Sequence, residues 1–248
     1  MEVKNIAIIG DSWAWGEWSF IGETNFPTHT GIQHYLQLEY PRANIVNFAR
    51  AGGSNLYQID YIQEHIGLEK FKDSFDVVIC FWTDPGRDIL NNIKEDADLS
   101  HYTEEIYISK CNNTAEVFLN QLNNLDIPVF LIGGQVSLPD ADKLSKYSNL
   151  IPSVNRMVNL VDKAFWNDKV NGPAKGKMDN TIDWMAPDRV SHLNFNKQFK
   201  DRLKVLQYEQ NLFPLNLNFF PDNGHAGRSL HRLACTKIIE QIGKLNGS

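Results

Sequence analysis

The chain alternates between short apolar runs and longer segments in which apolar residues recur at helical spacing. The apolar runs cover residues 3–9, 44–49, 75–82 and 127–134, and small or polar residues follow each of them. Apolar runs of this length, bounded by such residues, predict buried strands of a parallel sheet. The pattern therefore predicts four strands, each ending in a loop that can carry polar chemistry.

Amphipathic segments between and after these runs predict helices. They cover residues 32–38, 56–66, 103–124 and 230–245. Strands that alternate with helices are typical of βαβ units and a parallel sheet, so the fold class predicted is α/β. The segment between the first run and residue 32 predicts a loop, on account of Gly16, Gly22 and Pro27.

The region from residue 137 to residue 213 gives a weaker pattern. Residues 153–166 and 194–210 predict helices around a stretch rich in glycine and asparagine. A fifth strand is expected either at 181–185 or at 215–219, and the pattern does not decide between them. Since no repeat, low-complexity tract or linker interrupts the chain, we expect residues 1–248 to form a single domain.

The amino-acid composition reduces the number of functional classes to which the protein can belong. The 248 residues carry a net charge of −6, and their basic residues are scattered, which argues against a nucleic-acid partner. Three cysteines, odd in number and far apart, indicate free thiols in a reducing compartment rather than a disulfide framework or a zinc site. They are Cys80, Cys111 and Cys235.

The sequence shows neither a secretory signal pattern nor an apolar run of the about 18 residues that a membrane span requires. We therefore expect a cytoplasmic protein without a membrane partner, with carriage on a virion or export without a leader as the alternatives left open. The oligomeric state is not predicted.

The first apolar run ends in Gly10-Asp11-Ser12. In open α/β sheets ligands bind at the carboxyl ends of the strands, so a hydroxyl at this turn is positioned for nucleophilic chemistry. The alternative is that Ser12 only caps the next helix, because serine and aspartate are favoured at that position.

A second candidate motif, Asp222-Asn223-Gly224-His225, precedes the last predicted helix. A carboxylate three residues before a histidine can accept a hydrogen bond from one imidazole nitrogen while the other faces outward. A general base for a serine hydroxyl requires this arrangement. The spacing is common by chance, and a surface histidine is the alternative.

Three blocks in chain order resemble the SGNH (GDSL-type) hydrolase family. Gly10-Asp11-Ser12 is similar to the first block, and the segment from Asn47 to Ser54 is similar to the second. Asp222-x-x-His225, followed by His231, is similar to the last block. The resemblance implies a three-layer α/β/α sandwich with a flavodoxin-like parallel sheet of about five strands. It also implies a Ser12–His225–Asp222 triad, with the backbone N–H groups of Ser12 and Gly52 in the oxyanion hole.

The third block departs from the family pattern. Family members have Gly-x-Asn-Asp after the third strand, where the asparagine donates to the oxyanion; this chain has Trp82-Thr83-Asp84-Pro85. An ionised Asp84 would repel the developing negative charge. Three alternatives remain open: Thr83 donates instead, Asp84 is protonated, or the backbone N–H groups suffice.

Residues near these blocks are further candidates. Arg87 could pair with Asp84, contact an anionic substrate group or form a surface ion pair. Trp13 and Trp15 follow the candidate nucleophile and are expected either to pack in the core or to line a substrate cleft. We expect His231 to lie on an exposed helix face.

Together these observations predict a serine esterase (acylhydrolase) that needs no cofactor and no metal. Its substrate is a small-molecule or carbohydrate ester, with an acetylated sugar favoured slightly by the tryptophans. The alternatives are a catalytically weakened binding or structural protein of the same fold, which the altered third block favours, and an acyltransferase on the same triad.

Overall fold

The computed structural model describes residues 3–21, 24–91, 103–134, 136–160, 226 and 228–247. Within them a five-stranded parallel sheet has the order β4-β1-β5-β6-β7. The strands are β1 (Asn5–Ile9), β4 (Asn44–Asn47), β5 (Val77–Trp82), β6 (Val129–Gly133) and β7 (Leu150–Val154). Counted along the chain, this order is 2-1-3-4-5, the order of flavodoxin-like doubly wound sheets.

The sheet is apolar on both faces because its strands are buried from two sides. Ile6 and Ile8 of β1 face one hydrophobic core, whereas Ala7 and Ile9 face the other. The same alternation runs through β5 and β6, as the period of two in a strand requires. This explains why the sequence shows continuous apolar runs here instead of alternating ones.

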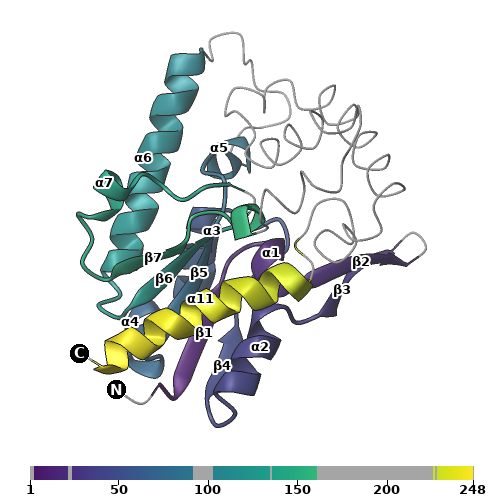
Figure 1. The fold of residues 1–248 in the computed structure, drawn as a ribbon. Helices are drawn as coiled ribbons and strands as arrows, with labels where there is room; N and C mark the ends of the chain where they lie inside the picture. The colour runs from purple at the N-terminus through teal and green to yellow at the C-terminus, as the bar shows by residue number, and fades with distance from the viewer. Residues whose placement is uncertain are drawn as a thin grey trace.

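Helices cover each face of the sheet (Figure 1). On one face lie α1 (Ser12–Trp15), α2 (Ile32–Glu39) and α11 (Arg228–Gly247), which supply apolar side chains to the first core. On the other lie α3 (Asn55–His65), α4 (Leu68–Ser74), α6 (Glu104–Asn123) and α7 (Ala141–Leu144), which supply the second. The fold is therefore a three-layer α/β/α sandwich, as predicted. A further short helix, α5 (Gly86–Asn91), follows β5, and a 3-10 turn (Met157–Leu160) follows β7.

Two predictions about local structure are wrong. The fifth strand of the sheet is β7, which includes Ser153 and Val154 where a helix was predicted. Its one apolar pair, Leu150-Ile151, is short and gives a weak strand signal, but β6 pairs with β7 through the ladder that starts at Val129 and Leu150. The segment predicted as a loop forms an antiparallel hairpin of β2 (Glu17–Ile21) and β3 (Thr24–His29). Its aromatic and β-branched residues on either side of Gly22 were an available hairpin signal.

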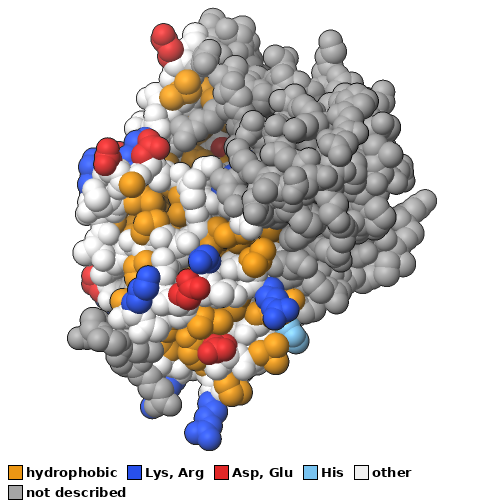
Figure 2. Space-filling model, in the orientation of Figure 1, with side chains coloured by type: hydrophobic (Ala, Val, Ile, Leu, Met, Phe, Trp, Pro, Cys, Tyr) orange, Lys and Arg blue, Asp and Glu red, His pale blue; other side chains and the backbone are white. Residues whose placement is uncertain are grey.

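The alternative strands at 181–185 and 215–219 and the helix at 194–210 lie outside the described residues. The prediction that residues 1–248 form one domain stays a prediction. No helix among the described residues has an apolar stretch long enough to cross a membrane. On the face shown in Figure 2, acidic and basic side chains of the described residues are interspersed.

The turn after β1 has no room for a side chain at Gly10. Its φ of +154° is a conformation that residues with a side chain rarely adopt. A Cβ there would lie 2.4 Å from the Ala14 Cβ and 2.7 Å from the Phe81 Cβ. Glycine at this position therefore lets β1 turn directly into α1.

We expect Gly10→Ala to lower the free energy of unfolding by about 2–4 kcal/mol, because it combines backbone strain with overpacking. Chemical denaturation measures this change. The control is Gly243→Ala in α11, where an added Cβ meets no atom within 4 Å. That change should raise stability by about 0.5–1 kcal/mol, because alanine is the better helix former. Equal effects of the two substitutions would contradict the steric argument.

Candidate functional site

The candidate site lies at the carboxyl ends of β1, β4 and β5. In a 2-1-3-4-5 sheet the strand order reverses between the first and third strands, here β1 and β5. The loops after these two strands leave in opposite directions, toward α1 on one face and α5 on the other. Ligand sites of doubly wound folds form in the crevice between such loops. Ser12 and Thr83 follow the two strands on either side of this point.

The helix that begins at Ser12 is capped by Asp11. The Asp11 Oδ1 accepts a hydrogen bond from the Trp13 N–H at 2.9 Å, and the Asp11 carbonyl accepts from the N–H groups of Ala14 and Trp15. The alternative interpretation of Ser12, that it serves only as the cap, is therefore wrong. Ser12 occupies the first helical position, and its residue surface is 7% exposed.

The second oxygen of Asp11 is also bound. The Asp11 Oδ2 lies 2.9 Å from the Arg87 Nη1 in a salt bridge that joins the loop after β1 to α5. The Asp11 side chain is 5% exposed and that of Arg87 is 28% exposed, so the carboxylate is desolvated and the guanidinium is its charge partner. Among the described residues, the salt bridge of Arg87 is formed with Asp11, which was not one of the partners predicted for it. The cation instead stabilises the turn that presents Ser12.

The loop after β4 is tied to the same turn by Asn47. Its side-chain Nδ2 donates to the Ala14 carbonyl at 3.0 Å, and its Oδ1 accepts from the Ala49 N–H at 2.9 Å. The loop then turns through Gly52, whose φ is +72° and whose surroundings are open. The Gly53 N–H closes this turn on the Arg50 carbonyl. The exposed Gly52 is thus presented at the strand edge in a conformation that favours glycine.

Asn55 fixes the loop after β5, and sequence reasoning missed it. Its Oδ1 accepts from the Thr83 N–H at 3.0 Å while its Nδ2 donates to the Thr83 carbonyl at 2.7 Å. Asn55 is fully buried, so this reciprocal pair replaces water at both backbone groups. The only available signal was an asparagine directly after Gly52-Gly53-Ser54, which is also a helix-start signal.

The pair with Asn55 uses the backbone of Thr83 and leaves its side chain out. No described residue forms a hydrogen bond with the Thr83 hydroxyl. This oxygen is also not one of the fully buried polar atoms that lack a hydrogen-bond partner. A hydroxyl in this state can donate to a ligand in the crevice.

Asp84 points into its own helix start. Its Oδ1 accepts from the Gly86 N–H at 2.8 Å, and its carbonyl accepts from the Arg87 N–H at 3.0 Å. An added Cβ at Gly86 would lie 3.2 Å from this oxygen and closer still to the Tyr107 hydroxyl, so the space around the carboxyl is filled. The carboxylate thus acts as an acceptor at the beginning of α5.

A second carboxylate, Asp88, holds the start of α3. Its Oδ1 accepts from the Leu56 N–H at 3.0 Å, and Ser54 and the Asn55 backbone also donate to it. Burial raises the pKa of Asp88 above its usual value, and these hydrogen bonds lower it in part. Asp88 was not singled out from the sequence, because aspartate on a short helix ordinarily indicates a solvated position.

The two tryptophans of the candidate cleft differ in exposure. Trp13 is 1% exposed and packs in the first core, beside the point where a Gly134 Cβ would lie. It is therefore a core residue, and substrate contact by Trp13 is not supported. Trp15 is 37% exposed and stays the tryptophan of this pair that can contact a ligand.

The prediction for His231 is wrong. The residue is fully buried on α11, with its ring 6.3 Å from the Phe81 ring and within 2.9 Å of where a Gly31 Cβ would lie. It belongs to the packing between α11 and the sheet, since the buried face of α11 also includes Leu230 and Ala234. Asp222 and His225 lie outside the described residues, so the remaining triad members stay predictions.

The cysteines are buried and free. Burial raises the pKa of Cys80 far above its usual value and that of Cys235 to about 12. Both thiols are thus protonated at neutral pH and are poor nucleophiles. Among the described residues, no cluster of three or more His, Cys, Asp or Glu side chains could hold a metal ion.

A comparison with models of known protein families gives no match, and a comparison with curated protein sequences gives none either. Several solved structures are similar to this chain. The lipase Lip_vut3 from a goat rumen metagenome is 12% identical over 96% of both chains, with a TM-score of 0.45. The acetyl xylan esterase AlAXEase is 13% identical over 96% of this chain and 99% of its own, with a TM-score of 0.44. A lipase/acylhydrolase from Enterococcus faecalis is 12% identical over 96% of this chain and 95% of its own, with a TM-score of 0.41.

Replacing Arg87 tests the salt bridge with Asp11. We expect Arg87→Ala to lower the free energy of unfolding by about 1–2 kcal/mol, because it leaves a buried carboxylate unpaired. The expected loss is below that of a fully buried pair because water reaches the guanidinium. The control is Lys72→Ala, which breaks a pair with the exposed carboxylate of Glu69 and should change stability by less than about 0.5 kcal/mol, because water solvates that carboxylate when the lysine is removed. Urea denaturation compares the two, and indistinguishable losses would argue against a stabilising pair.

Proposed function

We propose that this protein is a serine ester hydrolase with Ser12 as its nucleophile. The observation that carries the proposal is the position of Ser12 at the start of α1, where the strand order of the sheet reverses. Asp11 caps this helix and is paired with Arg87 in a salt bridge. Ser12 does not cap the helix, because Asp11 does, and its hydroxyl lies where doubly wound folds bind ligands. A hydroxyl in this position is suited to nucleophilic attack.

In the proposed reaction the Ser12 hydroxyl attacks the carbonyl carbon of an ester. His225, oriented by Asp222, takes the hydroxyl proton and later returns it to the leaving alcohol. Water, activated by the same histidine, then attacks the acyl-enzyme and releases the carboxylic acid. The sequence resemblance supports the roles of His225 and Asp222.

Three donors are proposed for the oxyanion. The backbone N–H groups of Ser12 and Gly52 are two of them, and the Thr83 hydroxyl is the third. Thr83 is favoured over Asp84 because the carboxylate already accepts from Gly86 at the start of α5, whereas no described residue binds the Thr83 hydroxyl. A threonine hydroxyl can donate where the family pattern has an asparagine amide.

The proposed substrate is a small acyl ester, and an acetyl group on a carbohydrate is the favoured case. The half-exposed Trp15 supports this choice, because an aromatic face can pack on a sugar ring. An acyltransferase would use the same groups and differ only in the acceptor of the acyl group. A binding protein of the same fold is the alternative outside enzymes, and the missing asparagine in the loop after β5 favours it.

Ser12→Ala tests the proposal directly. We expect the wild-type protein to hydrolyse p-nitrophenyl acetate and butyrate, and we expect the variant to lose this activity to the background rate, because no attacking group is left. Active-site labelling by a fluorophosphonate should follow the same pattern, with Ser12 as the modified residue.

Ser54→Ala is the matched control, since Ser54 caps α3 with its hydroxyl and lies in the neighbouring loop. It should retain labelling at Ser12. Absence of both labelling and turnover in the wild-type protein would favour the binding protein, and transfer to added alcohols would favour the acyltransferase.

Thr83→Val tests the proposed oxyanion donor. Valine keeps the shape of threonine but cannot donate, so we expect kcat to fall by about 10²-fold while KM changes little. Thr83→Ser should retain most of the activity. The backbone pair with Asn55 is available to all three residues, so thermal stability should stay close to that of the wild type. Equal kcat values for the valine and serine variants would exclude the hydroxyl from the reaction.

A further inference from the structure

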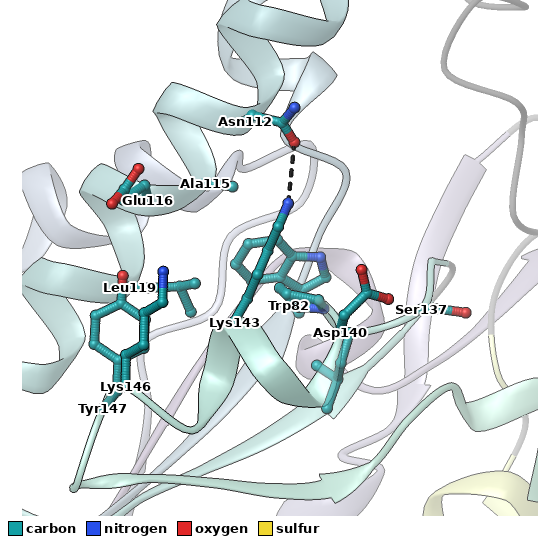
Figure 3. A pocket seen from close by; sticks show the side chains of 12 residues that line it. Trp82, Asn112, Ala115, Glu116, Leu119, Ser137, Asp140, Lys143, Lys146 and Tyr147 are labelled. Carbon is teal, nitrogen blue, oxygen red and sulfur yellow. Dashed lines mark hydrogen bonds between the residues drawn. The ribbon is translucent and has the colours of Figure 1, made fainter.

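A cavity of about 170 Å³ lies on the face of the sheet that carries α6 and α7 (Figure 3). Its lining combines polar and apolar groups, and the apolar ones include Trp82, Leu119 and Leu138. Only 3% of Trp82 is exposed, and its ring packs at 5.8 Å from Phe118, so the indole forms a fixed wall. The volume is close to that of an engineered cavity of about 150 Å³ that holds one benzene ring. The cavity therefore suits a small molecule with a compact apolar body.

The rim of this cavity carries charges of both signs. Lys143 and Lys146 come from α7 and the turn after it, Glu116 comes from α6, and Asp140 precedes α7. None of the four forms an ion pair with any described residue. The Lys143 Nζ makes one long hydrogen bond of 3.4 Å, to the Asn112 Oδ1 (Figure 3).

The two acidic side chains of the rim are Asp140 and Glu116. Asp140 stands at the position that caps α7, yet its side chain makes no capping hydrogen bond. Both Asp140 and Trp82 line the cavity (Figure 3). Burial, and next to it the negative charge of Glu116, raises the pKa of Tyr147 above its usual value. The tyrosine is therefore a neutral hydroxyl at the rim.

We propose that this cavity binds a small zwitterion with an apolar body, of the chemical class of a free aliphatic α-amino acid. The balance of charge decides between ligand classes. A simple anion would be attracted by the two lysines and repelled by the two carboxylates. A simple cation would be attracted by the carboxylates and repelled by the lysines. A ligand that carries both charges can place its carboxylate toward Lys146 and its ammonium toward Glu116, which line the same side of the cavity in Figure 3. Its side chain then fills the apolar interior.

Isothermal titration calorimetry with four probes tests this site on the full-length protein. L-Leucine carries both charges and an aliphatic side chain, and we expect it to bind with saturable heat at a ratio of one to one. 4-Methylpentanoate lacks the ammonium, isoamylamine lacks the carboxylate, and glycine lacks the apolar body. Each should bind at least about tenfold more weakly, because each loses a charged hydrogen-bonding group or the apolar contact.

Variants locate the binding. Lys146→Ala and Glu116→Gln should each weaken L-leucine binding by about tenfold or more. Lys70→Ala and Glu64→Gln, which remove exposed charges on α4 and α3, should leave it unchanged. Ser12→Ala should also bind normally, because this site does not depend on the proposed hydrolase. No heat with any probe, equal binding of the carboxylate or amine analogue, or binding that survives both rim variants would each overturn the proposal.

Discussion

The arrangement at the sheet edge depends on the Asp11 carboxylate. One oxygen caps α1 and the other accepts from Arg87, so a single buried side chain fixes both the direction of the helix and its link to the loop after β5. Buried ion pairs contribute little net stability, because desolvation offsets their attraction. The main effect of the Asp11–Arg87 pair is therefore to fix the geometry of the turn between β1 and α1. Both oxygens of the carboxylate are thus engaged at this turn, and Gly10 leaves no room there for a side chain.

The remaining loops are held by hydrogen bonds between loops that are far apart in the sequence. Asn47 joins β4 to α1, Asn55 joins α3 to β5, and Asp88 joins α5 to α3. Each is a short polar side chain that satisfies backbone groups at the end of a strand or helix. Since these groups are removed from water, a change in one loop leaves an unsatisfied partner in another. The edge of the sheet is therefore coupled as a unit, and this coupling keeps Gly52 and Thr83 in place.

The sequence was sufficient where the signal was local. Continuous apolar runs located β1, β4, β5 and β6 to within a few residues, and the Gly10-Asp11-Ser12 turn located the candidate nucleophile. It failed where a residue's role depends on a partner far along the chain. Arg87 lies 76 residues from Asp11, and Asn55 lies 28 residues from Thr83, so no spacing rule could pair them. The prediction that His231 lies on an exposed helix face failed for a related reason. A single histidine within an amphipathic helix does not reveal that Gly31 and Phe81 enclose it.

The segment at the end of β5 contributes residues both to the cavity beside α6 and to the candidate site. Trp82 turns inward to the cavity beside α6, and the next residue, Thr83, stands at the crevice with its backbone clamped by Asn55. Asp84 then begins α5 and thereby places Arg87 against Asp11. An acidic residue at this point would oppose an oxyanion if its carboxylate faced the crevice. In the structure one carboxylate oxygen of Asp84 instead accepts from the Gly86 N–H, so the side chain is held at the start of α5. The hydroxyl proposed as the oxyanion donor therefore belongs to the neighbouring residue, Thr83, and not to the position at which the family that the sequence resembles has its asparagine.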